Sequence, residues 1–242
     1  MAHGAPDDSN VVVQKQLYAM VDAGELAVRL GCVGSVDRLG NVLRAVSFEY
    51  GFDVEEVYET GIGASVSLVA EKGVWSGYSL CLETGTGPSN EVQVSWGVVH
   101  PEAARHGVEV WVNPNSDIVK LVFVPYINTG TTLDYGLVEI APATGAIRVS
   151  EAVGEWTEVS ERATIDQFGE FATPVKIVVD ASTKKLVRLR VGSKTIDLSN
   201  YNMISYAEVY PRIFRAYVTA YGDGETSGVV YISGVILTQN EP

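Results

Sequence analysis

Two histidines and a glutamate lie close together in one short segment. His100, Glu102 and His106 fall within the seven residues HPEAARH. Metal binding and acid–base catalysis both require such side chains to converge with further ligands or a partner group. The spacing matches no zinc-binding pattern, and the third histidine, His3, lies far away in the chain. The segment therefore indicates an ordinary loop, and we expect no metal site there.

Other catalytic patterns are missing as well. The stretch TGTG (84–87) is not followed by GK[ST], so it indicates a turn and not a phosphate-binding loop, and no GxSxG motif occurs. Two carboxylates about 5–9 Å apart could hydrolyse a glycosidic bond, and Glu91, Glu109, Glu139 and Glu208 lie on expected strands. We expect Glu109 and Glu139 to face solvent, because they alternate with apolar residues. The sequence predicts no catalytic residue.

Aromatic side chains are better candidates for a binding site. Sugars pack on aromatic rings beside fixed polar groups, and the chain has 4 Trp and 12 Tyr. Trp75 and Tyr78 flank a turn and the start of a strand, and Trp111 alternates with Val110 and Val112. Trp111 either points outward as a ligand platform or interface anchor, or lies in a strand buried on both faces. The alternative is that these aromatics fill the two sheet faces and a contact with the helix.

A tyrosine-dense segment at 201–225 contains one of the few basic regions of the chain. It contains Arg212 and Arg215, with Tyr217 and Tyr221 four residues apart and thus on one face of a strand. Tyr and Arg are enriched at protein interfaces. The segment predicts a protein–protein contact or a sugar site.

The elements that must position these side chains are β-strands. From Leu43 onward, apolar and polar residues alternate in about twelve short runs, separated by turns rich in Gly, Pro, Asn and Asp. EWTEVS (155–160) indicates an edge strand. No long helix or internal repeat is indicated. We predict an all-β fold, an antiparallel jelly-roll β-sandwich.

The N-terminal segment differs from the rest, so we divide the chain into an arm at 1–40 and a sandwich domain at 41–242. Val11, Val12, Val13 and Leu17 indicate an extended arm. Asp22 with Glu25 resembles a capping box, and Gly31 suits a helix C-terminus, which together predict a short helix with Leu26 and Leu30 on one face. The arm has too few apolar positions to fold alone, so we expect it to dock on the body or on a neighbouring copy.

Composition excludes several classes of protein. The 242 residues carry a formal charge of −13, which argues against nucleic-acid binding and against a polybasic membrane surface. No apolar run approaches 18 residues, so we expect no membrane insertion. The N-terminus has no signal-peptide pattern, which predicts synthesis in the cytoplasm. Cys32 and Cys81 are expected to be reduced and buried, although a disulfide is the alternative.

Three stretches resemble jelly-roll carbohydrate-binding modules and concanavalin-like, laminin-G-type sandwiches. They are FEYG (48–51), which resembles the opening strand of such modules, WSGYSLCLETG (75–85) and VKIVVDASTKKLVRLRVGSKTIDLS (175–199). The N-terminal arm is similar to the attachment segments of virion decoration and spike proteins. The resemblance implies an optional Ca²⁺ between the first and last strands, with Glu49 as a candidate ligand. Ser233 and Gly234 stand where an acidic pair would be needed to complete that site. We therefore predict no cofactor, with Ca²⁺ as the alternative.

Three functions follow in order of preference. The first is a non-enzymatic, self-assembling structural protein on a virion surface, whose partners are its own copies or other structural proteins. The alternative is a lectin or carbohydrate-binding module, which would require exposed aromatics with polar neighbours. The second alternative is a glycan hydrolase or lyase.

Overall fold

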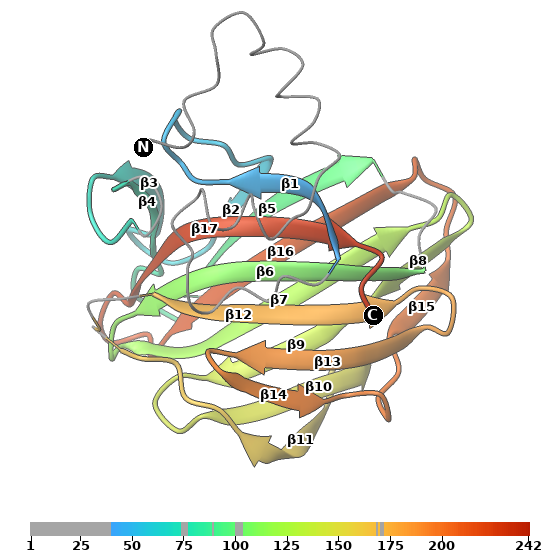
Figure 1. The fold of residues 1–242 in the computed structure, drawn as a ribbon. Coiled ribbons are helices and arrows are strands. Elements are labelled where there is room, and N and C mark those ends of the chain that lie inside the picture. Colours follow the sequence, from blue (N-terminus) through green and yellow to red (C-terminus); the bar gives the residue numbers. More distant parts are fainter. Residues whose placement is uncertain (1–39, 74–76, 89, 100–103, 168, 170–171) are drawn as a thin grey trace, which may run out of the picture.

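The computed structural model describes residues 40–73, 77–88, 90–99, 104–167, 169 and 172–242. Seventeen strands in these ranges form two antiparallel sheets stacked face to face (Figure 1). The predicted fold class, an antiparallel jelly-roll β-sandwich, is therefore confirmed for this part of the chain. The predicted arm and short helix lie outside the described residues, as do Val11, Val12, Val13, Leu17, Leu26 and Leu30.

Sheet A has eight strands in the order β14-β13-β12-β6-β17-β4-β3, and β1 pairs with β17 beside β4. Its strands are β1 (Asn41–Val46), β3 (Ser65–Val69), β4 (Ser79–Glu83), β6 (Arg105–Pro114), β12 (Thr173–Asp180), β13 (Lys185–Val191), β14 (Lys194–Asp197) and β17 (Val229–Gln239).

Sheet B has nine strands in the order β11-β10-β9-β7-β16-β5-β2, and β8 pairs with both β7 and β15. Its strands are β2 (Glu56–Glu59), β5 (Glu91–Val99), β7 (Ile118–Asn128), β8 (Thr132–Tyr135), β9 (Leu137–Ala141), β10 (Ala146–Ala152), β11 (Glu155–Arg162), β15 (Ile204–Ala207) and β16 (Ile213–Gly222). The predicted edge strand at 155–160 is β11 at the margin of this sheet.

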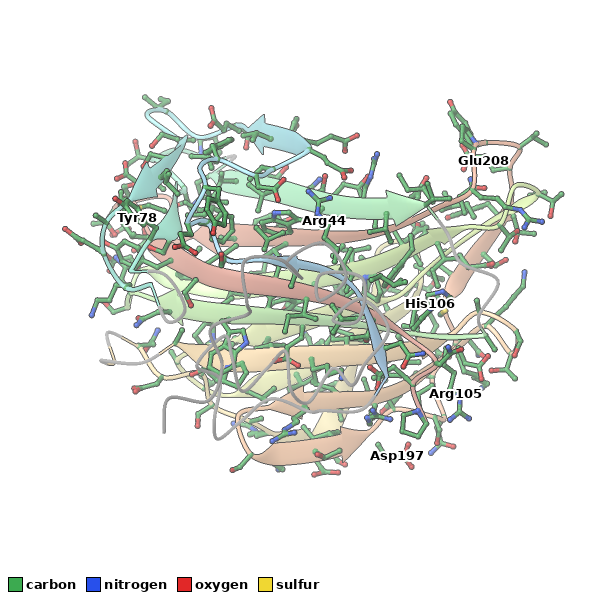
Figure 2. All side chains as sticks on the ribbon, turned by 45° about the horizontal axis from the view of Figure 1, so that its top comes forward. Arg44, Tyr78, Arg105, His106, Asp197 and Glu208 are labelled. Atoms are coloured by element: carbon green, nitrogen blue, oxygen red, sulfur yellow. The ribbon has the colours of Figure 1, made fainter. Side chains whose placement is uncertain are left out.

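The core lies between the sheets and follows the alternation of each strand. Its largest side chains include Trp96, Phe123 and Phe214, which are buried. Trp96 Nε1 donates a hydrogen bond to the Asp53 carbonyl at 2.7 Å, so the polar atom of its indole ring is satisfied. Arg44 of β1 reaches from sheet A to sheet B, where it donates to the Gly97 carbonyl at 2.6 Å (Figure 2).

The stretch 48–51 is a turn after β1 and not a strand, because Phe48 and Gly51 have positive φ angles of 60° and 123°.

Cys81 is a buried free thiol, as predicted. Burial, together with the nearby charges of Glu83 and Glu71, raises its pKa to about 11. In the described ranges no helix is long and apolar enough to span a bilayer.

Candidate functional site

One row of side chains crosses sheet B in direct register. The row runs through Tyr58, Gln93, Thr219, Val122, Glu139, Arg148 and Glu158 on strands β2, β5, β16, β7, β9, β10 and β11. Directly paired residues point to the same side of a sheet. The sequence neighbours of these residues belong to the core, for example Val94, Val218 and Ile140. The row therefore lies on the side that faces away from sheet A, which we call the outer face of sheet B.

Tyrosine rings flank this row. Tyr217 and Tyr221 each lie two residues from Thr219 along β16, one before it and one after it, which confirms that the two share a strand face. The rings of Tyr217 and Tyr126 pack edge to face, with centroids 5.7 Å apart. Lys120 Nζ lies 4.2 Å from the centroid of the Tyr221 ring. The outer face of sheet B thus carries adjacent aromatic and polar groups.

Arg215 is fixed at this face by hydrogen bonds and ion pairs. Its guanidinium donates to Glu56 Oε1 at 2.7 Å and to the Tyr217 hydroxyl at 3.0 Å, and it lies 3.5 Å from Glu55. A guanidinium held in this way presents its donors in a set orientation. Arg215 therefore holds both the tyrosine and the glutamate in place.

Glu139 is the most deeply buried carboxylate on this face. The residue is 3% exposed, and its Oε1 accepts a hydrogen bond from Arg148 Nε at 2.7 Å. Lys120 Nζ lies 3.5 Å from its Oε2. The expectation that Glu139 and Glu109 face solvent is wrong: both side chains point away from the core, yet neighbouring side chains bury both of them. Glu109 is 2% exposed and accepts a hydrogen bond from Trp111 Nε1 at 3.1 Å.

The tyrosine hydroxyls of this face stay protonated. Burial raises the pKa of Tyr221, and a hydrogen bond with Glu91 raises it further. Burial also raises the pKa of Tyr217, although the Arg215 charge opposes part of that effect. At neutral pH both hydroxyls can therefore donate as well as accept hydrogen bonds.

Aromatic side chains also mark both ends of the row. Tyr58 on β2 is 53% exposed. Trp156 on β11 is half-buried, with the Arg148 guanidinium carbon 5.6 Å from the centroid of its ring. These strands are six spacings apart in the sheet, which corresponds to about 28 Å at 4.7–4.9 Å per spacing. The face is long enough to contact an extended ligand at several points.

The other predicted binding residues do not join this face. Tyr78 is exposed beside β4, at the opposite end of the sandwich from Glu208 (Figure 2). Trp111 lies on sheet A and is 5% exposed, because β6 is buried on both sides, one of the two alternatives that its sequence allowed. Arg212 is exposed in the segment before β16. Trp75 lies outside the described residues.

Several residues of the face were not predicted as a set. Tyr58, Lys120, Tyr126, Arg148 and Trp156 come from strands far apart in the chain. The alternation of each strand showed which of its residues share a face, but it did not show which strands pair. The only local signal was the tyrosine-rich segment of β16, the strand at the centre of the face.

The calcium expectation has no structural support. Glu49 is exposed in the turn after β1. Across the described residues, no group of three or more Asp, Glu, His or Cys side chains is placed to hold a metal ion. β1 does pair with β17, and Val46 lies opposite Val235, next to Gly234. Calcium binding stays a prediction.

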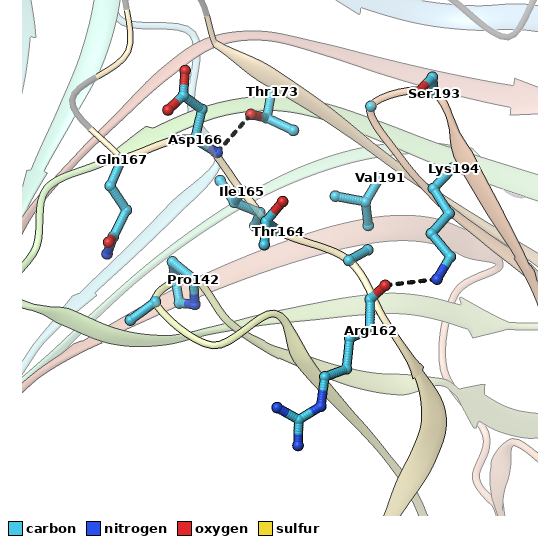
Figure 3. Close-up of a pocket in the computed structure, with 13 residues that line it drawn as sticks. Pro142, Arg162, Thr164, Ile165, Asp166, Gln167, Thr173, Val191, Ser193 and Lys194 are labelled. Atoms are coloured by element: carbon cyan, nitrogen blue, oxygen red, sulfur yellow. Dashed lines mark hydrogen bonds between the residues drawn. The ribbon is translucent and has the colours of Figure 1, made fainter.

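A separate pocket of about 760 Å³ opens beside the segment that joins β11 to β12 (Figure 3). Its wall includes Pro142, Arg162, Asp166, Val191 and Lys194. Lys194 Nζ donates to the Arg162 carbonyl at 2.7 Å and lies 3.3 Å from Glu161, so its charge is already paired. Of the predicted binding residues in the described ranges, none lines this pocket.

Comparison with known proteins assigns the chain to no family. No protein-family model and no curated protein matches the sequence. Among solved structures, the chain is similar to "Cellulose induced protein, Cip1", at 10% identity and a TM-score of 0.49 over 81% of this chain and 96% of that chain. It is similar to the beta-glucanase of Bacillus licheniformis, at 11% identity and a TM-score of 0.47 over 81% and 98% of the two chains.

A third similar structure is the carbohydrate recognition domain of Emp46p, at 7% identity and a TM-score of 0.47 over 83% of this chain and 95% of that one. At these identities and TM-scores, the similarities assign neither a ligand nor a reaction to this chain.

Proposed function

We propose that this protein binds an extended, uncharged glycan chain across the outer face of sheet B. The observation that carries the proposal is the row of seven outward-facing residues in register, with tyrosines on both sides of it. Such a face offers flat rings for the apolar faces of sugars and fixed polar groups for their hydroxyls. The width of the row suits a ligand that lies across the strands.

The charge of the face favours a neutral ligand. Lys120 and Arg148 are paired with Glu139, and Arg215 is paired with Glu55 and Glu56. Because each of these cations is paired with a carboxylate, the face offers little net positive charge to bind an anionic sugar. The chain as a whole has a charge of −13, which repels polyanions at low ionic strength.

Affinity electrophoresis of the full chain in gels that contain neutral or anionic polysaccharides tests the proposal. We expect retardation by at least one neutral polysaccharide and by no polyuronate. Tyr217→Ala and Tyr221→Ala should each weaken binding about tenfold, which corresponds to about 1.4 kcal/mol. Tyr78→Ala is the matched control, because Tyr78 is an exposed tyrosine outside the face, and it should bind like the unmodified chain.

Three results would contradict the proposal: no retardation by any neutral polysaccharide, retardation only by polyanions, or equal weakening by Tyr78→Ala. Release of reducing sugars from a bound polysaccharide would reassign the face to hydrolysis. The absence of enzymatic activity is a prediction until that assay is done. Self-assembly and a place on a virion depend on residues 1–40 and also stay predictions.

A further inference from the structure

The side of sheet A that faces away from the core is buried, although it consists of outward-pointing side chains. We call it the outer face of sheet A and define it by Glu109 and Trp111 of β6, Lys176 and Val178 of β12, and Ile236 and Thr238 of β17. Lys176, Glu109 and Ile236 lie in one row, and Val178 lies in register with Thr238 across Gly107. All six residues are between 0% and 5% exposed.

The outer face of sheet B shows what an uncovered face of this sandwich is like. There, Val122, Glu139 and Thr219 at the centre are only 3% to 6% exposed, but the longer side chains reach water: Tyr58 is 53% exposed, and the side chains of Lys120 and Arg148 are 33% and 43% exposed. On the outer face of sheet A the long side chains of Trp111, Lys176 and Ile236 are buried as well, at 5% exposure or less. Long side chains that point outward from a two-layer sandwich keep contact with water unless a third layer covers them. The outer face of sheet A therefore has a cover.

The described residues account for the two ends of this cover. At one end, Glu241 lies 2.8 Å from Lys176 Nζ and 2.7 Å from Arg188, and it accepts a hydrogen bond from Thr238 at 2.5 Å. At the other end, Asn113 Nδ2 donates to the Gly169 carbonyl at 2.8 Å. All seventeen strands in the described ranges belong to the two sheets, so none of these strands covers Glu109, Trp111 and Ile236.

The path of the chain indicates which segment completes the cover. β1 begins at Asn41, which pairs with Gln239 of β17. A Cβ atom on Gly40 would lie 2.5 Å from Glu241 Oε1, so the backbone of Gly40 lies directly against the Glu241 cap. The segment 1–39 therefore joins the described part at the margin of the outer face of sheet A. Every other stretch outside the described ranges has four residues or fewer.

We infer that residues 1–39 pack across the outer face of sheet A of the same chain. The segment contains the apolar residues Val11, Val12, Val13, Leu17, Leu26 and Leu30. It cannot form a core of its own, and a short helix is marginal in water unless it packs on another surface. The covalent link to β1 makes docking on its own sheet intramolecular, which favours it over docking on a second copy. The segment then forms a third layer over sheet A, while the outer face of sheet B stays open to solvent.

Thiol labelling of the full chain tests this inference. In a background with Cys32→Ser and Cys81→Ser, Ile236→Cys places the only thiol on the outer face of sheet A. Val119→Cys is the matched control, because Val119 is 45% exposed on β7 of the other sheet. We expect the Ile236→Cys thiol to react with Ellman's reagent at least about 100-fold more slowly than the Val119→Cys thiol, since reaction requires the cover to open.

Changes in the segment should then open the face. Leu26→Asp with Leu30→Asp is expected to raise the rate at Ile236→Cys at least about tenfold and to leave the rate at Val119→Cys unchanged, with the β circular dichroism retained. If that pair unfolds the chain, Leu26→Ala with Leu30→Ala replaces it. Equal rates at the two probes would overturn the inference, and so would a slow rate that no folded variant of the segment changes. If light scattering shows that the Ile236→Cys thiol reacts slowly only when the protein is a dimer, the cover belongs to the segment of the partner copy. That result would overturn packing within one chain.

Discussion

Glu139 is held by two cations that are themselves partly in water. Replacing it by Gln removes the charge but keeps the shape, and Arg148 and Lys120 can then be solvated because their side chains are 43% and 33% exposed. We expect Glu139→Gln to lower the free energy of unfolding by about 1–2 kcal/mol, less than the loss when a fully buried charge is left unpaired. Urea unfolding measures this difference.

Glu158 is the matched control for that substitution. It lies in the same row, but its ion pair with Arg162 is 3.5 Å long, and both side chains are about 60% exposed. Exposed pairs contribute little, so Glu158→Gln should change stability by less than about 0.5 kcal/mol. Equal effects of the two substitutions would show that the burial of Glu139 has no energetic consequence.

Asp180 makes stability depend on pH on the acid side. Burial alone raises its pKa, but the hydrogen bonds that its carboxylate accepts from Ser182, Thr183 and Arg105 outweigh burial and lower the pKa below its usual value. The unfolded chain therefore binds this proton first, at about pH 4. The contribution of Asp180 is complete above that pH, and it is lost as the pH falls through the lower pKa of the folded state.

Urea unfolding between pH 6 and pH 2.5 checks this prediction. The unmodified chain should lose stability below about pH 4, and Asp180→Asn should lose less over the same range, because its amide does not titrate. Asp180→Asn is expected to be less stable at pH 6. Parallel curves for the two proteins would contradict the assignment.

At the scale of the element, β7 carries a proline at the centre of sheet B. Pro125 cannot donate to a neighbouring strand, which normally confines proline to edges and bulges. Its carbonyl accepts a hydrogen bond from Gly136 N–H at 3.0 Å, where the strand opposite β7 breaks between β8 and β9. Since N and O of one strand residue point to the same side, the nitrogen of Pro125 also faces this break. Sheet B accepts the proline because the ladder is already interrupted there.

Glycine is required at position 136 because the side chain of Leu186 leaves no room for a Cβ atom there. A Cβ atom on Gly136 would lie 2.6 Å from Leu186 Cδ2, and Leu186 is fully buried in the core. Gly136→Ala should therefore destabilise the protein by about 1–3 kcal/mol, as overpacking does. Urea unfolding checks this, with Gly136→Ala combined with Leu186→Val as the companion variant. Leu186→Val makes room for the added methyl group, so the double variant should lose less stability than the sum of the losses of the two single variants.

Elements that run for seven or more residues could be predicted from alternation alone, as for β6 and β16. The four-residue strands β2 and β15 place only two side chains on each face, so alternation alone gives little pattern by which to predict them. The candidate site was predictable within β16, where Tyr217 and Tyr221 share a face. Its remaining residues come from strands whose pairing depends on the whole fold, so no local pattern brings Tyr58, Glu139 and Trp156 together.

At the scale of the whole molecule, burial of tyrosines limits stability in alkali. Burial raises the pKa of Tyr126, Tyr217, Tyr221 and Tyr231, and burial together with the neighbouring Tyr206 hydroxyl raises that of Tyr135 to about 12. Above about pH 10 the unfolded chain releases these protons while the folded chain retains them. The folded state then binds more protons, so the free energy of unfolding falls as the pH rises.

Unfolding by urea at pH 9, 10 and 11, with tyrosine ionisation followed by absorbance, tests this prediction. The free energy of unfolding should fall steadily above pH 10. That of the Tyr221→Phe variant should fall less steeply, because one buried phenol is removed. A flat profile up to pH 11 would show that these hydroxyls titrate equally in both states.

The positions of β16 and β17 determine when folding can be completed. These strands come last among the described residues, yet β16 separates β5 from β7 and β17 separates β4 from β6. While the chain is being synthesised, each sheet therefore lacks a central strand until residues 213–239 emerge. Until then β5, β7, β4 and β6 present unpaired edges, which are prone to aggregate. The yield of folded protein in a cell should therefore depend on how well chaperones protect the first two hundred residues during translation.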